Sequence, residues 1–455
     1  MHMASFSREG ASSLCRRTRV HQSDALPNGP KPIRRYTRDR LISMDSSRAA
    51  IVAWLMLFAV LPLGLAGSWV GTWATAVFPE PASKDKLPLP GGTLRQVVRV
   101  SVGGDTVRLR LSNVFGSTPL VLRDVRLAYV EKETSQRARK PCPLTFNGSN
   151  EVSIPPGAVM LSDPADFKLS ALADVSITMR LIQVPEMLTT HPGSRTTSYL
   201  TADADSDTIP PSEARKVVHW YFLSGLDVES ERPAAAIVVL GDSITDGYGT
   251  TTDGNNRWTD VLARRLQNQG PGDRIAVLNQ GIGGNRLLRD GLGPNILARL
   301  DRDVIAQSGA RWVIVLAGIN DIGTRLSARE RGEPYASAAD IIQALSQIIV
   351  RAHAREMIVI GGTLTPYAGA GFYWSEDGEV DRQAVNQWIR TSGQFDAVID
   401  FDAALRDPEN PTRLASVFDS GDHLHPSLAG YAEMARIVDL RRFVLKSSER
   451  YRISR

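Results

Sequence analysis

Residues 235–247 read AAIVVLGDSITDG, and this stretch decides the fold. Six apolar residues in succession are typical of a strand buried on both faces, as in a parallel sheet. The polar, glycine-containing residues 241–247 then predict a turn. In an open parallel sheet, ligands bind beyond the carboxyl ends of the strands. We therefore expect Ser243 and its neighbours to face a ligand.

Similar apolar runs recur toward the C-terminus. Further apolar runs that predict strands lie at 275–278, 312–316, 357–360 and 397–401. Predicted helices lie between the runs, at 258–267, 296–307, 338–353 and 380–390, with a last helix after Pro426. Strands that alternate with helices indicate βαβ units with right-handed crossovers. Residues 231–455 are thus predicted to form a three-layer α/β/α sandwich around a parallel sheet.

Residues 68–230 show a different pattern. The stretches 97–102, 107–111 and 175–181 alternate, or nearly alternate, between apolar and polar residues, and long helical periodicity is missing. This pattern predicts a β-sandwich domain of jelly-roll type. Gly103-Gly104-Asp105 predicts a hairpin between the first two strands. A polar stretch ending in Pro233 marks the boundary with the second domain.

The first 67 residues account for the net positive charge of the chain. They hold ten Lys or Arg and four acidic residues, a net charge of +6, so the remaining residues carry −2 of the chain's +4. Once such a leader is removed, no basic patch for nucleic acid remains to be explained, and no nucleic-acid partner is predicted. Removal would also leave Cys142 as the single cysteine, without a partner for an internal disulfide.

The leader at residues 1–67 has the features of a secretory signal. Arg48 precedes an apolar run at 49–63, and small residues follow at Gly64, Ala66 and Gly67. This order predicts a signal peptide at 44–67 and a secreted or periplasmic protein. An uncleaved membrane anchor is the alternative, because the run is nearly long enough to span a bilayer.

Four polar turns converge on the carboxyl edge of the predicted sheet. They read GDSITDG at 241–247, NQGIGGNR at 279–286, GIND at 318–321 and DSGDHLHP at 419–426. A hydrolytic serine needs a base and a group that orients the base. Asp422 lies three residues before His425, so its carboxylate can reach one ring nitrogen while the other faces Ser243. The neighbouring His423 lacks this spacing.

These turns resemble the four sequence blocks of the SGNH (GDSL) hydrolases. The blocks are Gly-Asp-Ser, Asn-x-Gly-x-Gly-Gly, Gly-x-Asn-Asp and Asp-x-x-His-Pro, and they occur here in that order. The resemblance covers about residues 234–445 and implies a flavodoxin-like fold. It implies Ser243 as nucleophile, with Asp422 and His425 completing the triad. The implied oxyanion donors are Ser243, Gly284 and Asn320, with Gly284 favoured over Gly283.

A narrower resemblance concerns substrate. Asn-Arg-Trp-Thr-Asp at 256–260, Gly-Ile-Gly-Gly-Asn-Arg-Leu-Leu at 281–288 and Asp-Arg-Asp-Val at 301–304 are similar to the branch related to xylan acetylesterases. The resemblance implies a secreted serine esterase acting on acetyl or short-chain acyl esters, with acylated polysaccharide as a candidate substrate. A lipase or thioesterase of the same family and a non-catalytic glycan-binding protein are the alternatives.

Other polar and aromatic residues near these turns have two interpretations each. Asp242, Asp246 and Asp321 are expected to cap backbone N–H groups rather than to take part in chemistry. The loop at 365–378 carries aromatic residues that could line a substrate site or pack against the neighbouring domain. The candidates for substrate binding in this loop are Tyr367, Tyr373 and Trp374. No metal-ligand spacing or dinucleotide motif occurs, so no metal and no cofactor are predicted.

Overall fold

The computed structural model describes residues 68–82, 92–130, 140–202, 214–230, 234–269 and 274–445. The predicted leader at 1–67, with its signal peptide or anchor, lies outside these residues. None of the helices in the described ranges is long and apolar enough to cross a membrane.

The predicted parallel sheet is confirmed. Its strands are β16 (Ala234–Gly241), β17 (Arg274–Gly281), β18 (Ala310–Leu316), β19 (Ile358–Gly362) and β20 (Ala397–Ile399). They lie in the order β17-β16-β18-β19-β20, all parallel, which is the flavodoxin-like order. Every residue of β16 is buried, as expected of a central strand covered on both faces. Gly241 pairs with Gly281 and Leu316, so the three strands end at one edge.

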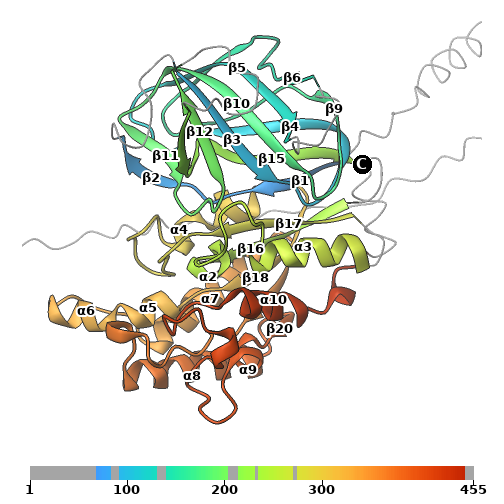
Figure 1. The fold of residues 1–455 in the computed structure, drawn as a ribbon. Coiled ribbons are helices and arrows are strands. Elements are labelled where there is room, and N and C mark those ends of the chain that lie inside the picture. Colours follow the sequence, from blue (N-terminus) through green and yellow to red (C-terminus); the bar gives the residue numbers. More distant parts are fainter. Residues whose placement is uncertain are drawn as a thin grey trace, which may run out of the picture. The chain divides into compact units, whose positions relative to one another are not determined.

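Helices cover both faces of this sheet (Figure 1). The longer ones are α3 (Trp258–Gln269), α7 (Ala338–His353), α8 (Glu376–Thr391) and α10 (Leu428–Arg436). The α-helix α3 packs against α10, whereas α7 packs against α8. Right-handed crossovers place these two pairs on opposite faces, which gives the predicted three layers. Short helices α2 (Ser243–Asp246), α5 (Ile319–Gly323), α6 (Arg325–Glu330) and α9 (Phe401–Leu405) lie near the strand ends.

For two of the predicted elements, the structure gives a physical reason for the difference in bounds. The predicted helix at 296–307 is α4 (Ile296–Leu300) followed by a π-helix, Asp301–Ile305. In the π-helix, Ala306 N–H donates to Asp301 O, five residues earlier. Asp303, within this turn, accepts a hydrogen bond from the buried Arg299. The predicted strand at 397–401 ends at Ile399, because the Asp400 side chain accepts from Ala403 N–H and begins α9.

The segment at 68–230, called the β segment below, contains only strands among its described residues. They are β1 (Ser68–Ala74), β2 (Phe78–Pro81), β3 (Thr93–Arg99), β4 (Gly104–Ser112), β5 (Leu120–Tyr129), β6 (Cys142–Pro143), β7 (Glu151–Ile154), β8 (Val159–Leu161), β9 (Ala165–Leu169), β10 (Asp174–Gln183), β11 (Met187–His191), β12 (Thr197–Thr201), β13 (Arg215–Val218), β14 (Trp220–Tyr221) and β15 (Leu223–Ser230). They form antiparallel sheets with orders β1-β15-β4-β8, β13-β12-β3-β10-β5-β6 and β14-β11-β2. The jelly-roll connectivity stays a prediction.

The predicted hairpin at Gly103–Asp105 is wrong. The strands on its two sides belong to different sheets, since β3 pairs with β10 and β12 while β4 pairs with β15, β8 and β9. The chain crosses between the sheets at 100–103. There the backbone N–H groups of Ser101 and Val102 donate to the buried hydroxyl of Thr72. Glycine-rich residues at 103–105 do interrupt the strands, but long-range pairing decides which strands lie beside one another.

The β segment covers the open edge of the parallel sheet. Strand β17 pairs only with β16 in its sheet, and β1 runs beside it (Figure 1). Val277 N–H on β17 donates to Ser101 Oγ at 3.2 Å, and Gly71 N–H donates to Ser308 O at 2.9 Å. Covering an edge strand in this way satisfies its backbone groups and prevents further strand pairing.

Arg382 ties helices to the loop that follows β19. Its fully buried guanidinium donates to Leu364 O, Glu379 and Asp402 at 2.7–2.8 Å. The loop that carries Tyr373 therefore begins at a backbone position held by α8 and α9.

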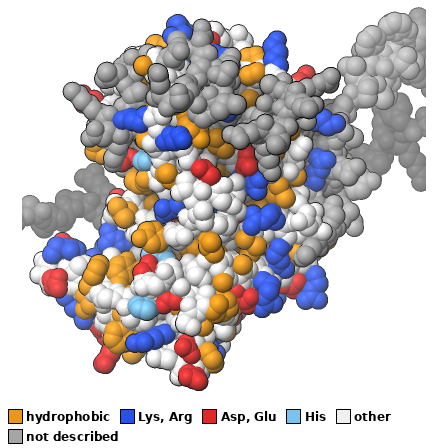
Figure 2. All heavy atoms as spheres, viewed as in Figure 1, with side chains coloured by type: hydrophobic (Ala, Val, Ile, Leu, Met, Phe, Trp, Pro, Cys, Tyr) orange, Lys and Arg blue, Asp and Glu red, His pale blue; other side chains and the backbone are white. Residues whose placement is uncertain are grey.

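On the surface, basic and acidic side chains are interspersed on the face shown in Figure 2.

Candidate active site

The serine-bearing turn begins directly at the end of β16. Ser243 is the first residue of α2, and the Asp242 carboxylate accepts from Ile244 N–H at 3.0 Å. Gly247 ends the helix with a φ of 91°, a left-handed conformation that favours glycine. A first-turn N–H has no acceptor within its own helix, so the backbone N–H of Ser243 stays available to a ligand.

His425 bridges Ser243 and Asp422. Its Nε2 lies 2.8 Å from Ser243 Oγ, and its Nδ1 lies 2.6 Å from Asp422 Oδ2. Because the carboxylate accepts at Nδ1, we assign the ring proton to Nδ1, which leaves Nε2 to accept from the serine hydroxyl. The structure thus brings the three predicted triad residues together from turns 182 residues apart in sequence.

Hydrogen bonds keep Asp422 ionised and burial keeps His425 neutral. Burial alone would raise the pKa of Asp422, but donation from the backbone and ring of His425 and from Leu424 N–H outweighs it and lowers the pKa to about 2. Burial lowers the pKa of His425 below its ordinary 6.5, against the opposing effect of Asp422, and the charge of Arg195 lowers it further. Both effects favour the forms that a general base needs.

Gly284 and Asn320 line the same cavity as Ser243. Gly284 has a φ of 68°, and an added Cβ would lie 2.7 Å from Leu292 Cδ1, so a side chain would be strained and crowded there. Asn320 is buried at the start of α5, and its Nδ2 donates to Asn285 O at 3.0 Å. A carboxamide nitrogen carries two hydrogens, so a second one remains for a ligand.

Tyr373 orients the Asn320 carboxamide. The Tyr373 hydroxyl donates to Asn320 Oδ1 at 2.5 Å. Burial, with a smaller effect from Asp242, raises the pKa of Tyr373 above its ordinary value, which keeps the hydroxyl protonated as a donor. Because the oxygen and the nitrogen of the carboxamide each have a hydrogen-bond partner, these two bonds define which way the Asn320 side chain is oriented.

Arg299 and Asp321 hold the glycine-rich turn after β17. The fully buried Arg299 donates to Gly241 O at 2.9 Å, Gln280 O at 2.8 Å and Asn285 Oδ1 at 3.0 Å. Asp321 accepts from Leu287 N–H at 2.8 Å and from Leu288 N–H at 3.3 Å. The prediction that Asp242 and Asp321 cap backbone groups is confirmed, whereas the Asp246 carboxylate pairs instead with the side chains of His191 and Arg195. Sequence reasoning missed Arg299, since an arginine in a helix is most often on the surface.

Two of these carboxyl groups have raised pKa values. Burial raises the pKa of Asp242 to about 7, and the nearby charge of Asp321 adds to the effect against the Ile244 N–H bond and Arg299. Burial likewise raises the pKa of Asp321 to about 6, opposed by its two backbone donors.

A cavity of about 350 Å³ opens at Ser243. Its lining residues are Ser243, Tyr248, Gly283, Gly284, Leu292, Asn320, Ala370, Phe372, Tyr373, Asp422, Leu424 and His425. The apolar members lie around the polar centre, and the Phe372 side chain is 81% exposed. Such a mainly apolar cavity with a few convergent polar groups suits a small organic ligand.

Of the three aromatic residues predicted to bind substrate, only Tyr373 lines this cavity. Tyr367 is fully buried beneath it and packs against Gly378, and Trp374 is half-buried against the core. Their role in binding stays a prediction. Sequence reasoning missed Tyr248, Leu292 and Leu424, whose place at the cavity depends on loop packing that no local pattern encodes.

The described residues show no cluster suited to a metal ion. Across 68–445, the undescribed gaps aside, no group of three or more His, Cys, Asp or Glu side chains is arranged to hold one.

A serine, a histidine and an aspartate in this geometry at the edge of a parallel sheet are the arrangement of serine hydrolases. Residues 239–433 match the model of the GDSL-like Lipase/Acylhydrolase family, so this segment of the chain is similar to the members of that family. No curated protein sequence matches the chain.

Several solved structures are similar to part of the chain. A putative lipolytic protein of the G-D-S-L family from Desulfitobacterium hafniense is 23% identical over 45% of this chain and 99% of its own, with a TM-score of 0.34. A lipase/acylhydrolase from Enterococcus faecalis is 23% identical over 46% and 94%, with a TM-score of 0.36. A mutant of an acetyl-xylooligosaccharide esterase from Geobacillus Stearmophilus is 22% identical over 46% and 94%, with a TM-score of 0.36.

Proposed function

We propose that the protein is a serine esterase that hydrolyses carboxylic esters through an acyl-enzyme, with Ser243 as nucleophile and His425 as general base. The observation that carries the proposal is the position of His425, 2.8 Å from Ser243 Oγ and 2.6 Å from Asp422 Oδ2. Both distances are within the range for proton transfer and for orientation of the base.

In the acylation half-reaction, His425 Nε2 takes the hydroxyl proton as Ser243 Oγ attacks the ester carbonyl carbon. The carbonyl electron pair moves to oxygen, and the oxyanion accepts from the N–H groups of Ser243, Gly284 and Asn320. The intermediate then collapses, the carbon–oxygen bond to the alcohol breaks, and the imidazolium returns its proton to the leaving oxygen. The products of this half-reaction are the free alcohol and an ester on Ser243.

In the second half-reaction, His425 takes a proton from water while the water oxygen attacks the acyl carbon. The second oxyanion accepts hydrogen bonds from the same donors. Its collapse breaks the bond to Ser243 Oγ, which recovers its proton from His425, and the carboxylic acid leaves. Asp422 stays ionised throughout and stabilises the imidazolium, in keeping with its pKa of about 2.

We further propose a short acyl group, with acylated polysaccharide as the candidate substrate, for a protein that is secreted after cleavage within 44–67. The shallow, exposed rim formed by Phe372 and Leu292 supports access by a bulky alcohol part. Initial rates on acetylated xylan and on esters of increasing acyl length rank the substrates. Higher rates on long-chain esters would favour a lipase instead.

The test of the chemistry is hydrolysis of p-nitrophenyl acetate. Ser243→Ala and His425→Ala should abolish turnover while the melting temperature stays within a few degrees of the parent. His353→Ala is the matched control, because this half-exposed histidine pairs with Asp396 at 2.8 Å on the surface. Full activity in Ser243→Ala would refute the proposal.

A further inference from the structure

The connector between β11 and β12, residues 192–196, reaches from the β segment to the serine-bearing turn. His191, the last residue of β11, is buried, with Nδ1 2.8 Å from Ala76 O and Nε2 3.0 Å from Asp246 Oδ1. Asp246 is the last residue of α2, one turn after Ser243. Gly193 lies so close that an added Cβ would be 2.0 Å from Asp246 Oδ2. The connector is therefore fitted to this turn.

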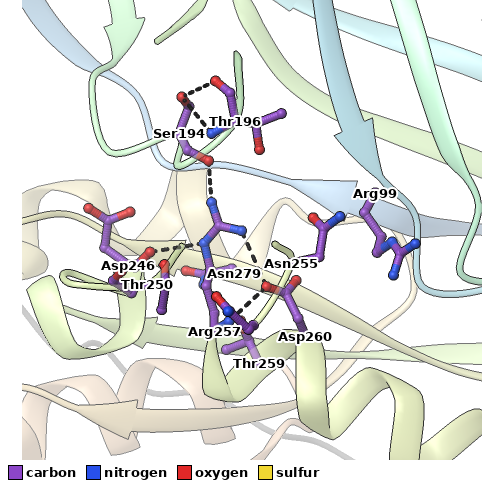
Figure 3. Close-up of polar contacts among 12 residues, drawn as sticks. Arg99, Ser194, Thr196, Asp246, Thr250, Asn255, Arg257, Thr259, Asp260 and Asn279 are labelled. Atoms are coloured by element: carbon purple, nitrogen blue, oxygen red, sulfur yellow. Dashed lines mark hydrogen bonds and ion pairs between the residues drawn. The ribbon is translucent and has the colours of Figure 1, made fainter. Parts of the chain in front are cut away.

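Arg257 links the connector to the residues around the serine-bearing turn (Figure 3). Its guanidinium donates to Ser194 O and to Asp246 O, the latter at 3.0 Å, and lies 3.3 Å from Asp260. Asp253 N–H donates to Arg195 O at 2.9 Å. These bonds hold Arg195 at a φ of 47°, a left-handed conformation that costs a non-glycine residue free energy unless its surroundings impose it.

The Arg195 side chain extends to the edge of the active site. Its guanidinium carbon lies 5.4 Å from the ring centroid of Tyr248, and Nη2 lies 4.0 Å from Asp246 Oδ2. The Tyr248 ring in turn lies against His425, with centroids 4.2 Å apart and planes inclined by 33°. The Tyr248 ring is thus in contact both with a cation from the β segment and with the imidazole.

We propose that Arg195 is a positioning residue of the active site, which from the β segment holds Tyr248 against His425 and so keeps the imidazole aligned with Ser243. This proposal rests on the proposed function of His425 as a base. It makes the β segment part of the catalytic apparatus rather than a detachable binding module.

Arg195 also has an electrostatic consequence for the base. The charged groups that act on His425 are Asp422, which raises its pKa, and Arg195, which lowers it; Ser243 and Tyr248 contact the ring without charge. Asp246, on the same short helix as Ser243, pairs with His191 and with Arg195. Removing the Arg195 charge should therefore leave His425 easier to protonate.

Two substitutions distinguish the contact that Arg195 makes with Tyr248 from the effect of the Arg195 charge on His425. Arg195→Gln removes both, so we expect kcat to fall about fivefold, in line with loss of one cation–aromatic contact. The ratio of kcat/KM at pH 5.5 to that at pH 8 should also fall, since the acid limb moves to higher pH. Arg195→Lys keeps the charge without the planar guanidinium, so kcat should fall while the pH ratio stays near the parent value.

The measurement is the pH profile of p-nitrophenyl acetate hydrolysis at low and high NaCl, with melting temperatures for each variant. Arg441→Gln is the control, because Arg441 is 91% exposed and its ion pair among the described residues is with Asp439. At high NaCl, the ratio of kcat/KM at pH 5.5 to that at pH 8 should differ less between the parent and Arg195→Gln. The reason is that Arg195 is partly exposed, so salt screens its charge. A lower melting temperature with an unchanged kcat and pH ratio in both variants would overturn the proposal.

The Ser243→Ala and Arg195 variants together distinguish a failure of the positioning role of Arg195 from a failure of the proposed esterase function. If Ser243→Ala keeps full turnover, the base and nucleophile are wrong. If Ser243→Ala is inactive and Arg195→Gln matches the parent in kcat and pH ratio, only the positioning role is wrong. Should Arg195→Gln fail to fold, Arg195→Lys decides the matter through kcat, which a role limited to charge would leave unchanged.

Discussion

Substitution of Tyr373 by Phe removes one hydroxyl and leaves the ring. In the parent, that hydroxyl donates to Asn320 Oδ1 at 2.5 Å, while Asn320 Nδ2 donates to Asn285 O at 3.0 Å. Loss of the first bond frees the carboxamide to rotate. The second Nδ2 hydrogen would then point toward the oxyanion only part of the time.

The size of the effect follows from the kind of bond that is lost. A hydrogen bond between neutral groups contributes about 0.5–1.5 kcal/mol, which corresponds to roughly a 2- to 12-fold loss of kcat. Removal of an oxyanion donor costs more, on the order of 10²–10³ in rate. We therefore expect Tyr373→Phe to lower kcat about fivefold and Asn320→Ala to lower it about a hundredfold or more, with KM nearly unchanged in both.

The assay is a double-mutant cycle with p-nitrophenyl acetate. Because Tyr373 is proposed to act through Asn320, its hydroxyl should matter only while the Asn320 carboxamide is present. The double variant should match Asn320→Ala alone. If Tyr373→Phe lowers kcat by the same factor in both backgrounds, the two residues act independently and the reasoning is refuted.

Three further predictions concern pH and packing. Because burial holds the pKa of His425 below 6.5, the acid limb of kcat/KM should lie below pH 6.5, and a limb above that value would contradict the assignment. Asp242 has a folded pKa of about 7 against an ordinary 3.8, so its contribution to stability is present below pH 3.8 and lost as pH rises through about 7. Asp242→Asn should therefore raise the free energy of unfolding at pH 8, by at most about 4 kcal/mol, and leave it nearly unchanged at pH 4, as measured by urea denaturation. Gly281→Ala would place a Cβ 2.3 Å from Asp246 N, a backbone atom, and should cost about 3 kcal/mol or more, whereas at Gly283 the nearest atom is 3.6 Å away and the alanine variant should melt like the parent.

The parallel sheet and the triad could be predicted because their signals are local. An apolar run such as 235–240 specifies a buried strand, and the polar turn after it must lie at the carboxyl edge. Asp422 and His425 are three residues apart, so their contact needs only one turn of chain. Parallel strands bring such turns together whatever the loops between them contain, which is why Gly284 and Asn320 could be placed at the same cavity as Ser243.

The partners of the β strands could not be predicted in the same way. Alternation identified β3, β4 and β10, but it specifies which face of a strand is buried and not which strand lies beside it. The glycines at 103 and 104 fit a hairpin and a crossing between sheets equally well. The long-range pairing of β3 and β4 with different strands distinguishes the two, and the Thr72 hydroxyl of β1 binds the backbone where the chain crosses.

The sequence by itself predicted the candidate nucleophile, its candidate base and the parallel sheet that presents them, because each depends on residues close together in the chain or on the common direction of parallel strands. The tertiary structure alone decided that Arg299 is buried beneath the glycine-rich turn, that Tyr373 contacts Asn320, and that Arg195 reaches Tyr248 from the connector between β11 and β12. Those contacts join residues distant in sequence, and their free energy comes from burial and hydrogen bonding that exist only once the chain has folded.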